Sequence, residues 1–224
     1  MIDLPMAVNS MGIFGSEPPP AEKKTYAQIF IDDYIAPDEG KEPHQSIEDY
    51  TVTGSYGMKK EARKRYPNLN DYEAAVAFTN DNIKEIKSKI GVEQWESLPQ
   101  KSKFMVSNLY YNTGSLFNNF KKDLRNGNVM GAAKNSLDVV SSMNKDTGKV
   151  GVLNGLINRR ARNYNLAASD FDSPKIKNYK IIKKASNKTQ IIYNLENDKT
   201  IPITVNKPLS ELSAGEGVYD VRNY

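Results

Sequence analysis

The chain contains no cysteine and a single histidine, His44, and these two shortages exclude several kinds of site. Without cysteine there can be no thiol nucleophile, no disulfide and no thiolate ligand for a metal. With one histidine, zinc sites built from several imidazoles are impossible, and a Ser-His-Asp triad would depend on His44 alone. Hydrolytic chemistry would therefore fall to carboxylates, and we expect neither a metal nor a cofactor.

Long apolar runs are also missing. No window approaches the ~18 consecutive apolar residues of a membrane span, so none is predicted. The first 20 residues lack a basic segment followed by an apolar core, so no signal peptide is predicted. The formal net charge of +4 over 224 residues is mildly basic. Such a charge suits an anionic polymer, either cell wall or nucleic acid, without choosing between them.

The composition changes along the chain, which predicts three parts. Residues 1–23 carry a triple proline and read as an extended arm. Residues 24–168 are dominated by helical patterns, whereas 169–224 read as a linker followed by the β-branched runs YKIIKKA, TQIIYNL and TIPITV. This last part is too short for a large core of its own, so we expect it to pack on the helical domain or on a partner. The predicted class is α+β and mainly α, with a small C-terminal β appendage.

Apolar residues at three- and four-residue spacing predict the longer helices over 24–36, 71–90 and 99–111. Pro37 should end the first of these, and Asp71 can cap the second. Further helices are predicted over 58–66, around 116–124, from Asn128 through Val140, and over 152–166. A strand or hairpin is predicted between Tyr50 and Tyr56, and a polar loop over 145–149.

Three motifs between residues 98 and 166 follow one another in a specific order. They are Tyr111-Asn112-Thr113-Gly114, Asn126-Gly127-Asn128 leading to Gly131-Ala132-Ala133, and Gly155-Leu156-Ile157-Asn158-Arg159-Arg160. In order and spacing they resemble the C-terminal lobe of phage-type lysozymes, glycoside hydrolase family 24. Asp38-Glu39-Gly40 after the first helix and the Thr51–Gly57 turn extend the resemblance over roughly residues 25–166. It implies a two-lobed lysozyme-like domain.

The resemblance also implies an activity and a set of catalytic residues. The activity is hydrolysis of the β-1,4 bond between N-acetylmuramic acid and N-acetylglucosamine, with Glu39 as general acid. The second carboxylate would be Glu48 or Asp49, and Thr53 or Thr51 would position the attacking water. An inverting enzyme of this kind needs its two carboxyl groups ~6.5–9.5 Å apart.

The resemblance and the appended parts together imply a place of action. The implied partners are bacterial peptidoglycan and other virion or tail proteins, the latter contacted through residues 1–23 and the C-terminal module. The enzyme would be carried in a phage virion and act in the host cell envelope. Binding to nucleic acid is not expected, because it needs a concentrated cationic face.

An alternative is a structural protein of a phage tail or internal assembly that keeps a lysozyme-like fold without activity. Two departures from the family favour it, namely Pro37 close before Glu39 and the irregular second carboxylate. Other polar residues have ordinary structural interpretations: His44 is a solvated loop residue and Trp95 a packing residue. Arg159 and Arg160 support the interface between the lobes through hydrogen bonds.

Overall fold

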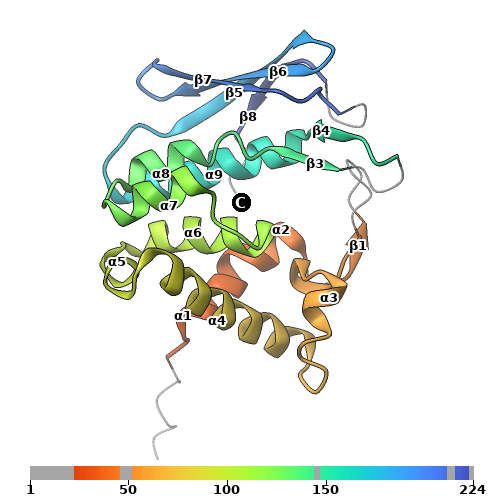
Figure 1. Ribbon diagram of the computed structural model, residues 1–224, viewed down its shortest axis with the longest axis vertical. Helices are drawn as coiled ribbons and strands as arrows, with labels where there is room; N and C mark the ends of the chain where they lie inside the picture. Colours follow the sequence, from red (N-terminus) through yellow and green to blue (C-terminus); the bar gives the residue numbers. More distant parts are fainter. Residues whose placement is uncertain (1–22, 46–51, 144–146, 211–214, 222–224) are drawn as a thin grey trace, which may run out of the picture.

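The computed structural model describes residues 23–45, 52–143, 147–210 and 215–221, which combine helices with β-sheets, so the predicted α+β class is confirmed. From bottom to top in Figure 1, α4 and α5 are followed by the first helix and α6, then by α7, α8 and α9, and finally by a sheet. The helices are α1 (Tyr26–Phe30), the π-helix η1 (Ile31–Ile35), α2 (Ala36–Glu39), the 3-10 helix η2 (Ser55–Gly57), α3 (Lys60–Arg63), α4 (Asp71–Ile90), α5 (Val92–Ser97), α6 (Gln100–Thr113), α7 (Asn118–Arg125), α8 (Val129–Asn135) and α9 (Asn154–Asp170). The strands are β1 (His44–Gln45), β2 (Val52–Thr53), β3 (Ser141–Met143), β4 (Val150–Val152), β5 (Ile176–Ala185), β6 (Lys188–Leu195), β7 (Thr200–Val205) and β8 (Gly217–Asp220).

The first helical segment runs without a break from Tyr26 to Glu39, so the prediction that Pro37 ends it is wrong. In a regular α-helix a proline lacks the amide donor, and its ring collides with the carbonyl four residues earlier. Here a π-helical turn comes first, in which the Ala36 amide donates to the Ile31 carbonyl five residues back. The wider turn accommodates Pro37, and the helix continues to Glu39.

The long helix α4 has the predicted bounds, but its cap lies one residue earlier than predicted. The Asn70 side chain accepts a hydrogen bond from the Glu73 amide at 2.9 Å, and the Glu73 carboxylate accepts one from the Asn70 amide at 3.1 Å. This reciprocal pair is a capping box, and it displaces Asp71 from the capping role. Gly91, with a φ of 102°, ends the helix.

The central helix α6 is buried on more than one face, as its all-round apolar pattern indicates. One face carries Phe104, which belongs to a small apolar cluster with Phe30 and Ile35 of the first helical segment. Another carries Leu109, which belongs to a larger cluster formed with α7, α8 and α9. Because α6 contributes to both clusters, it fixes the position of Glu39 relative to α9.

Helix α8 ends at Asn135, earlier than the predicted helix that was to include Val140. Val140 is buried outside any helix and is followed by a hairpin of β3 and β4, whose strands lie on either side of the predicted loop over 145–149. The Leu153 amide closes the hairpin by donating to the Val140 carbonyl at 2.9 Å. Each strand has only three residues, too few for a clear alternation of apolar and polar side chains.

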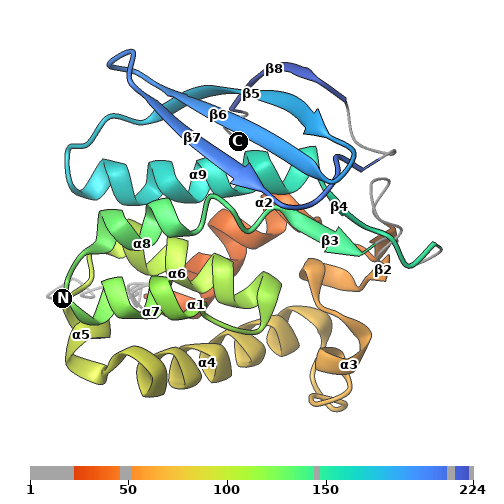
Figure 2. The same cartoon turned by 45° about the horizontal axis from the view of Figure 1, so that its top comes forward.

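The C-terminal strands form an antiparallel sheet with the order β7-β6-β5-β8. Its inner face contributes Tyr179 and Tyr193 to the larger apolar cluster, and the Tyr193 hydroxyl donates to the Leu137 carbonyl at 3.0 Å. Figures 1 and 2 both place this sheet against α9. The β-rich module therefore packs on the helices and shares their core. Helix α9 continues to Asp170, so the stretch predicted to be a linker begins inside a helix.

Candidate functional site

Glu39 is the last residue of α2 and is 7% exposed. Gly40 follows it with a φ of 72°, a backbone conformation that glycine adopts without steric cost and that turns the chain away from the helix axis. The carboxylate therefore lies at the carboxyl end of a helix. That position is unfavourable for a negative charge, because the helix dipole leaves unpaired carbonyl oxygens there.

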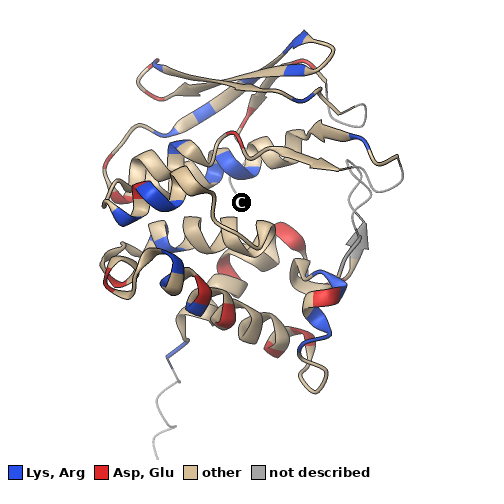
Figure 3. Ribbon diagram, in the orientation of Figure 1, with Lys and Arg blue, Asp and Glu red and all other residues tan. Residues whose placement is uncertain are grey.

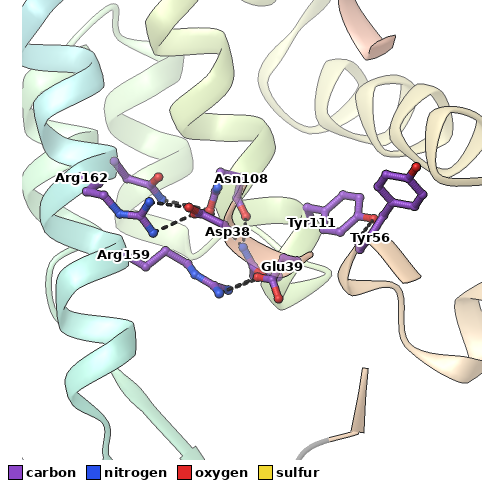
Figure 4. Close-up of polar contacts among 9 residues, drawn as sticks. Asp38, Glu39, Tyr56, Asn108, Tyr111, Arg159 and Arg162 are labelled. Carbon is purple, nitrogen blue, oxygen red and sulfur yellow. Dashed lines mark hydrogen bonds and ion pairs between the residues drawn. The ribbon is translucent and has the colours of Figure 1, made fainter. Parts of the chain in front are cut away.

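Arg159 of α9 compensates for this placement. Its Nη2 atom lies 2.5 Å from Oε1 of Glu39, and its Nη1 atom donates to Oδ1 of Asn112 at 2.6 Å (Figure 4). The side-chain amide of Asn112 in turn donates to the backbone carbonyl of Asn108 at 2.8 Å. Asn108 and Asn112 lie on successive turns of α6. The Arg159 guanidinium is therefore oriented by the central helix α6 as well as by α9.

Gly57 packs directly against the Glu39 side chain. A Cβ atom added at Gly57 would lie only 2.6 Å from Cγ of Glu39, and the φ of Gly57 is 67°. Both observations require glycine at this position. The backbone of the η2 segment is thus in van der Waals contact with the carboxylate side chain and limits its movement.

Two hydrogen bonds also join η2 to the rest of the site. The Tyr56 amide donates to the Gly40 carbonyl at 3.1 Å, and the Tyr111 hydroxyl donates to the Tyr56 carbonyl at 2.7 Å. Burial, and then the charge of Glu39, raise the pKa of Tyr111, so its hydroxyl stays protonated and remains a donor. Tyr56 itself has a φ of 55°, which is uncommon for a residue with a side chain and is held here by these two hydrogen bonds.

Asp38 is the neighbour of Glu39 but interacts with a different arginine. Both carboxylate oxygens of Asp38 pair with the guanidinium of Arg162, with Nη2 and Oδ2 2.7 Å apart. Arg159 and Arg162 are three residues apart on α9, so they project from the same side of that helix. A cavity of about 550 Å³ adjoins this second pair, lined among others by Asp38, Asn108 and Arg162, and Glu39 does not line it.

The structure does not test the remaining site residues that were predicted from the sequence. Glu48, Asp49 and Thr51 lie outside the described residues. Thr53 is in β2, where its backbone pairs with His44 of β1, and its side chain is not described. The second carboxylate and the residue that positions water therefore stay predictions. Trp95 is buried with its ring edge against Tyr26 at a centroid distance of 5.9 Å, as expected for a packing residue.

Three residues of the site were missed in the sequence. Gly57 was read only as a turn point and Asn112 only as the end of a helix. Arg162 was not expected to pair with Asp38, 124 positions away in the sequence. The three-residue spacing of Arg159 and Arg162 was the available signal, since it places two guanidinium groups on one side of a helix.

The chemistry open to this arrangement is that of a carboxyl group. A buried carboxyl group beside an arginine can transfer a proton to a bound substrate, or it can serve only as half of an ion pair. Among the described residues, no group of three or more His, Cys, Asp and Glu side chains could hold a metal ion. Within the same part of the chain, no helix is long and apolar enough to cross a membrane.

Comparisons with known proteins add no further constraint. No family model matches the chain, and neither a curated protein nor a solved structure matches it.

Proposed function

We propose that the chain is a peptidoglycan hydrolase, a muramidase that cleaves the β-1,4 bond between N-acetylmuramic acid and N-acetylglucosamine. Glu39 is the general acid that protonates the leaving oxygen. Glu48 or Asp49 supplies the second carboxylate, and Thr53 or Thr51 positions the attacking water. In this mechanism the acid must carry a proton when substrate is bound, and the second carboxylate must be charged.

One observation supports this proposal above the others. The sequence contains two motifs of the resemblance that were identified separately, Glu39-Gly40 after the first helix and the arginines of the Gly-Leu-Ile-Asn-Arg-Arg stretch. In the structure Glu39 and Arg159, 120 positions apart, meet in one ion pair. A fold that merely contained both motifs would not need to bring them together, so their meeting favours a shared role.

The surroundings of Glu39 are consistent with a rigidly held catalytic group. Gly57 limits the side chain on one side and Arg159 on the other. The Arg159 guanidinium pairs with Oε1 of the Glu39 carboxyl group. A carboxyl group held in one geometry can meet a bound glycosidic oxygen without a large reorganisation.

A structural protein with a lysozyme-like fold and no activity is the second candidate. The ion pair between Glu39 and Arg159 also favours it, because a buried pair is a purely structural use of a carboxylate. Under this candidate, replacing Glu39 changes stability and nothing else.

Both candidates are proposed to act within a phage particle, with residues 1–23 and the C-terminal module contacting other virion proteins. The support is the architecture alone, in which a β-rich module packs on the helices and shares their core. Co-purification with virions tests this placement, since a virion protein remains with particles after washing at high salt.

A zymogram on peptidoglycan separates the two candidates. Wild type should clear the gel, and Glu39→Gln should not. Glu93→Gln provides a matched control, because Glu93 is an exposed glutamate of α5. Equal clearing by wild type and Glu39→Gln would reject Glu39 as the acid, and no clearing by any folded variant would favour the structural protein.

A further inference from the structure

We propose that the chain binds an anionic polymer of the bacterial cell wall through a lysine patch at the tip of the C-terminal sheet. The lysine patch consists of Lys183, Lys184, Lys188 and Lys207. The identity of the polymer as cell wall rests on the proposed function, whereas the existence of the patch does not. Its ligand would present repeated phosphate or carboxylate groups along an extended chain.

The strand register places the four lysines next to one another. Lys183 lies opposite Thr189, and Ala185 opposite Lys188, at the turn between β5 and β6. Thr189 pairs with Val205 of β7, and its hydroxyl donates to the Lys207 carbonyl at 3.0 Å. Neighbouring strands are about 4.8 Å apart, so the four lysines lie on adjoining strand ends. Because successive side chains alternate between the two faces, the lysines surround the tip of the sheet on both faces.

The charges of the lysine patch are left unbalanced. All four lysines are exposed, and none has an ion pair within the described ranges. Glu216 is close, but its carboxylate accepts a hydrogen bond from the backbone amide of Lys183. Some lysines elsewhere are paired: Lys84 pairs with Asp81 at 3.0 Å and Lys87 with Glu96 at 2.6 Å. Adjoining like charges without partners repel one another, so an anionic ligand is attracted to this tip.

The lysine patch is connected to α9 through β4. The Val152 amide of β4 donates to the Pro208 carbonyl at 2.8 Å, directly after Lys207. Strand β4 leads within two residues into α9, which carries Arg159. Figures 1 and 2 place the β5–β6 turn and the β3–β4 hairpin on the same side of the molecule, and Figure 3 shows Lys or Arg at the β5–β6 turn.

The composition of the lysine patch favours a diffuse polyanion over nucleic acid. It has no arginine, whose planar group binds phosphates and stacks on bases. None of its four residues is aromatic, so it offers no surface on which bases could stack. Lysines alone bind as mobile point charges, which suits wall polymers whose anionic groups are irregularly placed.

The test measures binding to purified bacterial cell walls by co-sedimentation, at several salt concentrations. Glu39→Gln is the parent, so that binding is measured without hydrolysis. The four lysines of the patch are replaced by glutamine, and the control carries four exposed lysines from other regions as glutamine: Lys101, Lys122, Lys134 and Lys175. At about 0.1 M salt we expect binding to weaken about tenfold for the patch variant and less than about twofold for the control.

Two further arms identify the source of the charge and the alternative ligand. Walls stripped of phosphodiester polymers distinguish phosphate from the carboxylates of peptidoglycan itself, and either result fits the proposal if binding depends on the patch. Equal binding of parent and patch variant to walls overturns it. Loss of duplex DNA binding with unchanged wall binding also overturns it and assigns the patch to nucleic acid.

The outcome is separable from that of the proposed function. If wild type proves inactive but the patch variant still loses wall binding, the lysine patch stands and the hydrolase proposal fails. If wild type is active, the same four substitutions in wild type should slow hydrolysis of intact walls and leave hydrolysis of short soluble glycan fragments unchanged.

Discussion

Two adjacent carboxylates, Asp38 and Glu39, each pair with an arginine of α9, yet their surroundings differ. Asp38 uses both oxygens against Arg162 and adjoins the cavity next to the β-rich module. Glu39 pairs through Oε1 with Arg159 and packs against Gly57. In the first arrangement both oxygens of a buried carboxylate face one guanidinium. In the second, the carboxyl side chain is enclosed between a guanidinium and a glycine of η2.

The difference shows how α2 can be fixed against α9 by one carboxylate, Asp38, while the next residue, Glu39, is held in a separate position. A bidentate pair between Asp38 and Arg162 fixes α2 against α9 in one orientation. That orientation then determines where Glu39, the next residue, projects. We therefore expect substitutions on the Asp38 side to act on stability and those on the Glu39 side to act on activity.

The largest expected effect on stability comes from breaking the ion pair between Asp38 and Arg162. Arg162→Met leaves the Asp38 carboxylate, whose side chain is 9% exposed, without its cation. Removing one partner of a buried pair costs about 3–5 kcal/mol of the free energy of unfolding. Chemical denaturation measures this cost. The double variant Asp38→Asn/Arg162→Met should lose less than Arg162→Met alone, and an equal or greater loss would mean that the pair contributes no coupling energy.

A smaller effect on stability, joined to a larger one on activity, is expected from Gly57→Ala. The added Cβ would be forced against Glu39 and would displace its carboxyl group, so we expect hydrolysis to fall at least about tenfold. Gly114→Ala is the matched control, because Gly114 has a similar φ of 68° and nothing within 4 Å of the added Cβ. Gly114→Ala should lose about 1–2 kcal/mol of stability through its positive φ alone, and Gly57→Ala should lose more because its Cβ must also displace Glu39. Equal activity in the two variants would contradict the role of Gly57.

Arg160 is a third arginine of α9, and it has no carboxylate partner among the residues that the structure describes. It is 1% exposed, its Nε donates to the Val139 carbonyl at 3.1 Å, and its Nη1 has no hydrogen-bond partner in the described part of the chain. Burial, and then the charge of Arg159, lower the pKa of Arg160. Arg160→Met should therefore be neutral or stabilising by about 1 kcal/mol. A large loss of stability in thermal melts would show that the guanidinium has a compensating partner.

The smallest effect is expected at an exposed carboxylate. Asp71 accepts hydrogen bonds from Arg63 Nε at 2.8 Å and Ser55 Oγ at 2.7 Å, and these lower its pKa below 3.8. A depressed pKa in the folded state stabilises the fold above the unfolded pKa, and the contribution is lost as the pH falls through the folded value. Because the side chain is half exposed, Asp71→Asn should cost no more than about 1 kcal/mol at pH 7. Denaturation at pH 7 and below pH 4 should show this difference disappearing in acid.

The sequence predicted those elements whose signals are local. The bounds of α4 followed from its apolar spacing and from Gly91, and the β-rich module followed from alternating β-branched runs. The prediction that Pro37 ends the first helix was wrong because the effect of this proline depends on the π-helical turn before it. No single residue in Ile31–Ile35 indicates that shift in hydrogen-bond register. The β3–β4 hairpin was missed because each strand has only three residues, too few to show an alternating pattern.

The candidate site was predictable only in part, for a physical reason. Glu39 could be selected by its place after a helix and before a glycine. Its enclosure could not, because Gly57, Asn112 and Arg159 approach it only through the packing of α6 and α9. Contacts between residues so distant in sequence depend on the whole core.

The most direct test of Glu39 as the general acid is the rate at which purified peptidoglycan gains new reducing ends, with their sugar identified after reduction. Wild type should produce N-acetylmuramic acid ends, and folded Glu39→Gln should produce them at least about a thousandfold more slowly. Equal rates for the two proteins, or reducing ends on N-acetylglucosamine, would contradict the account.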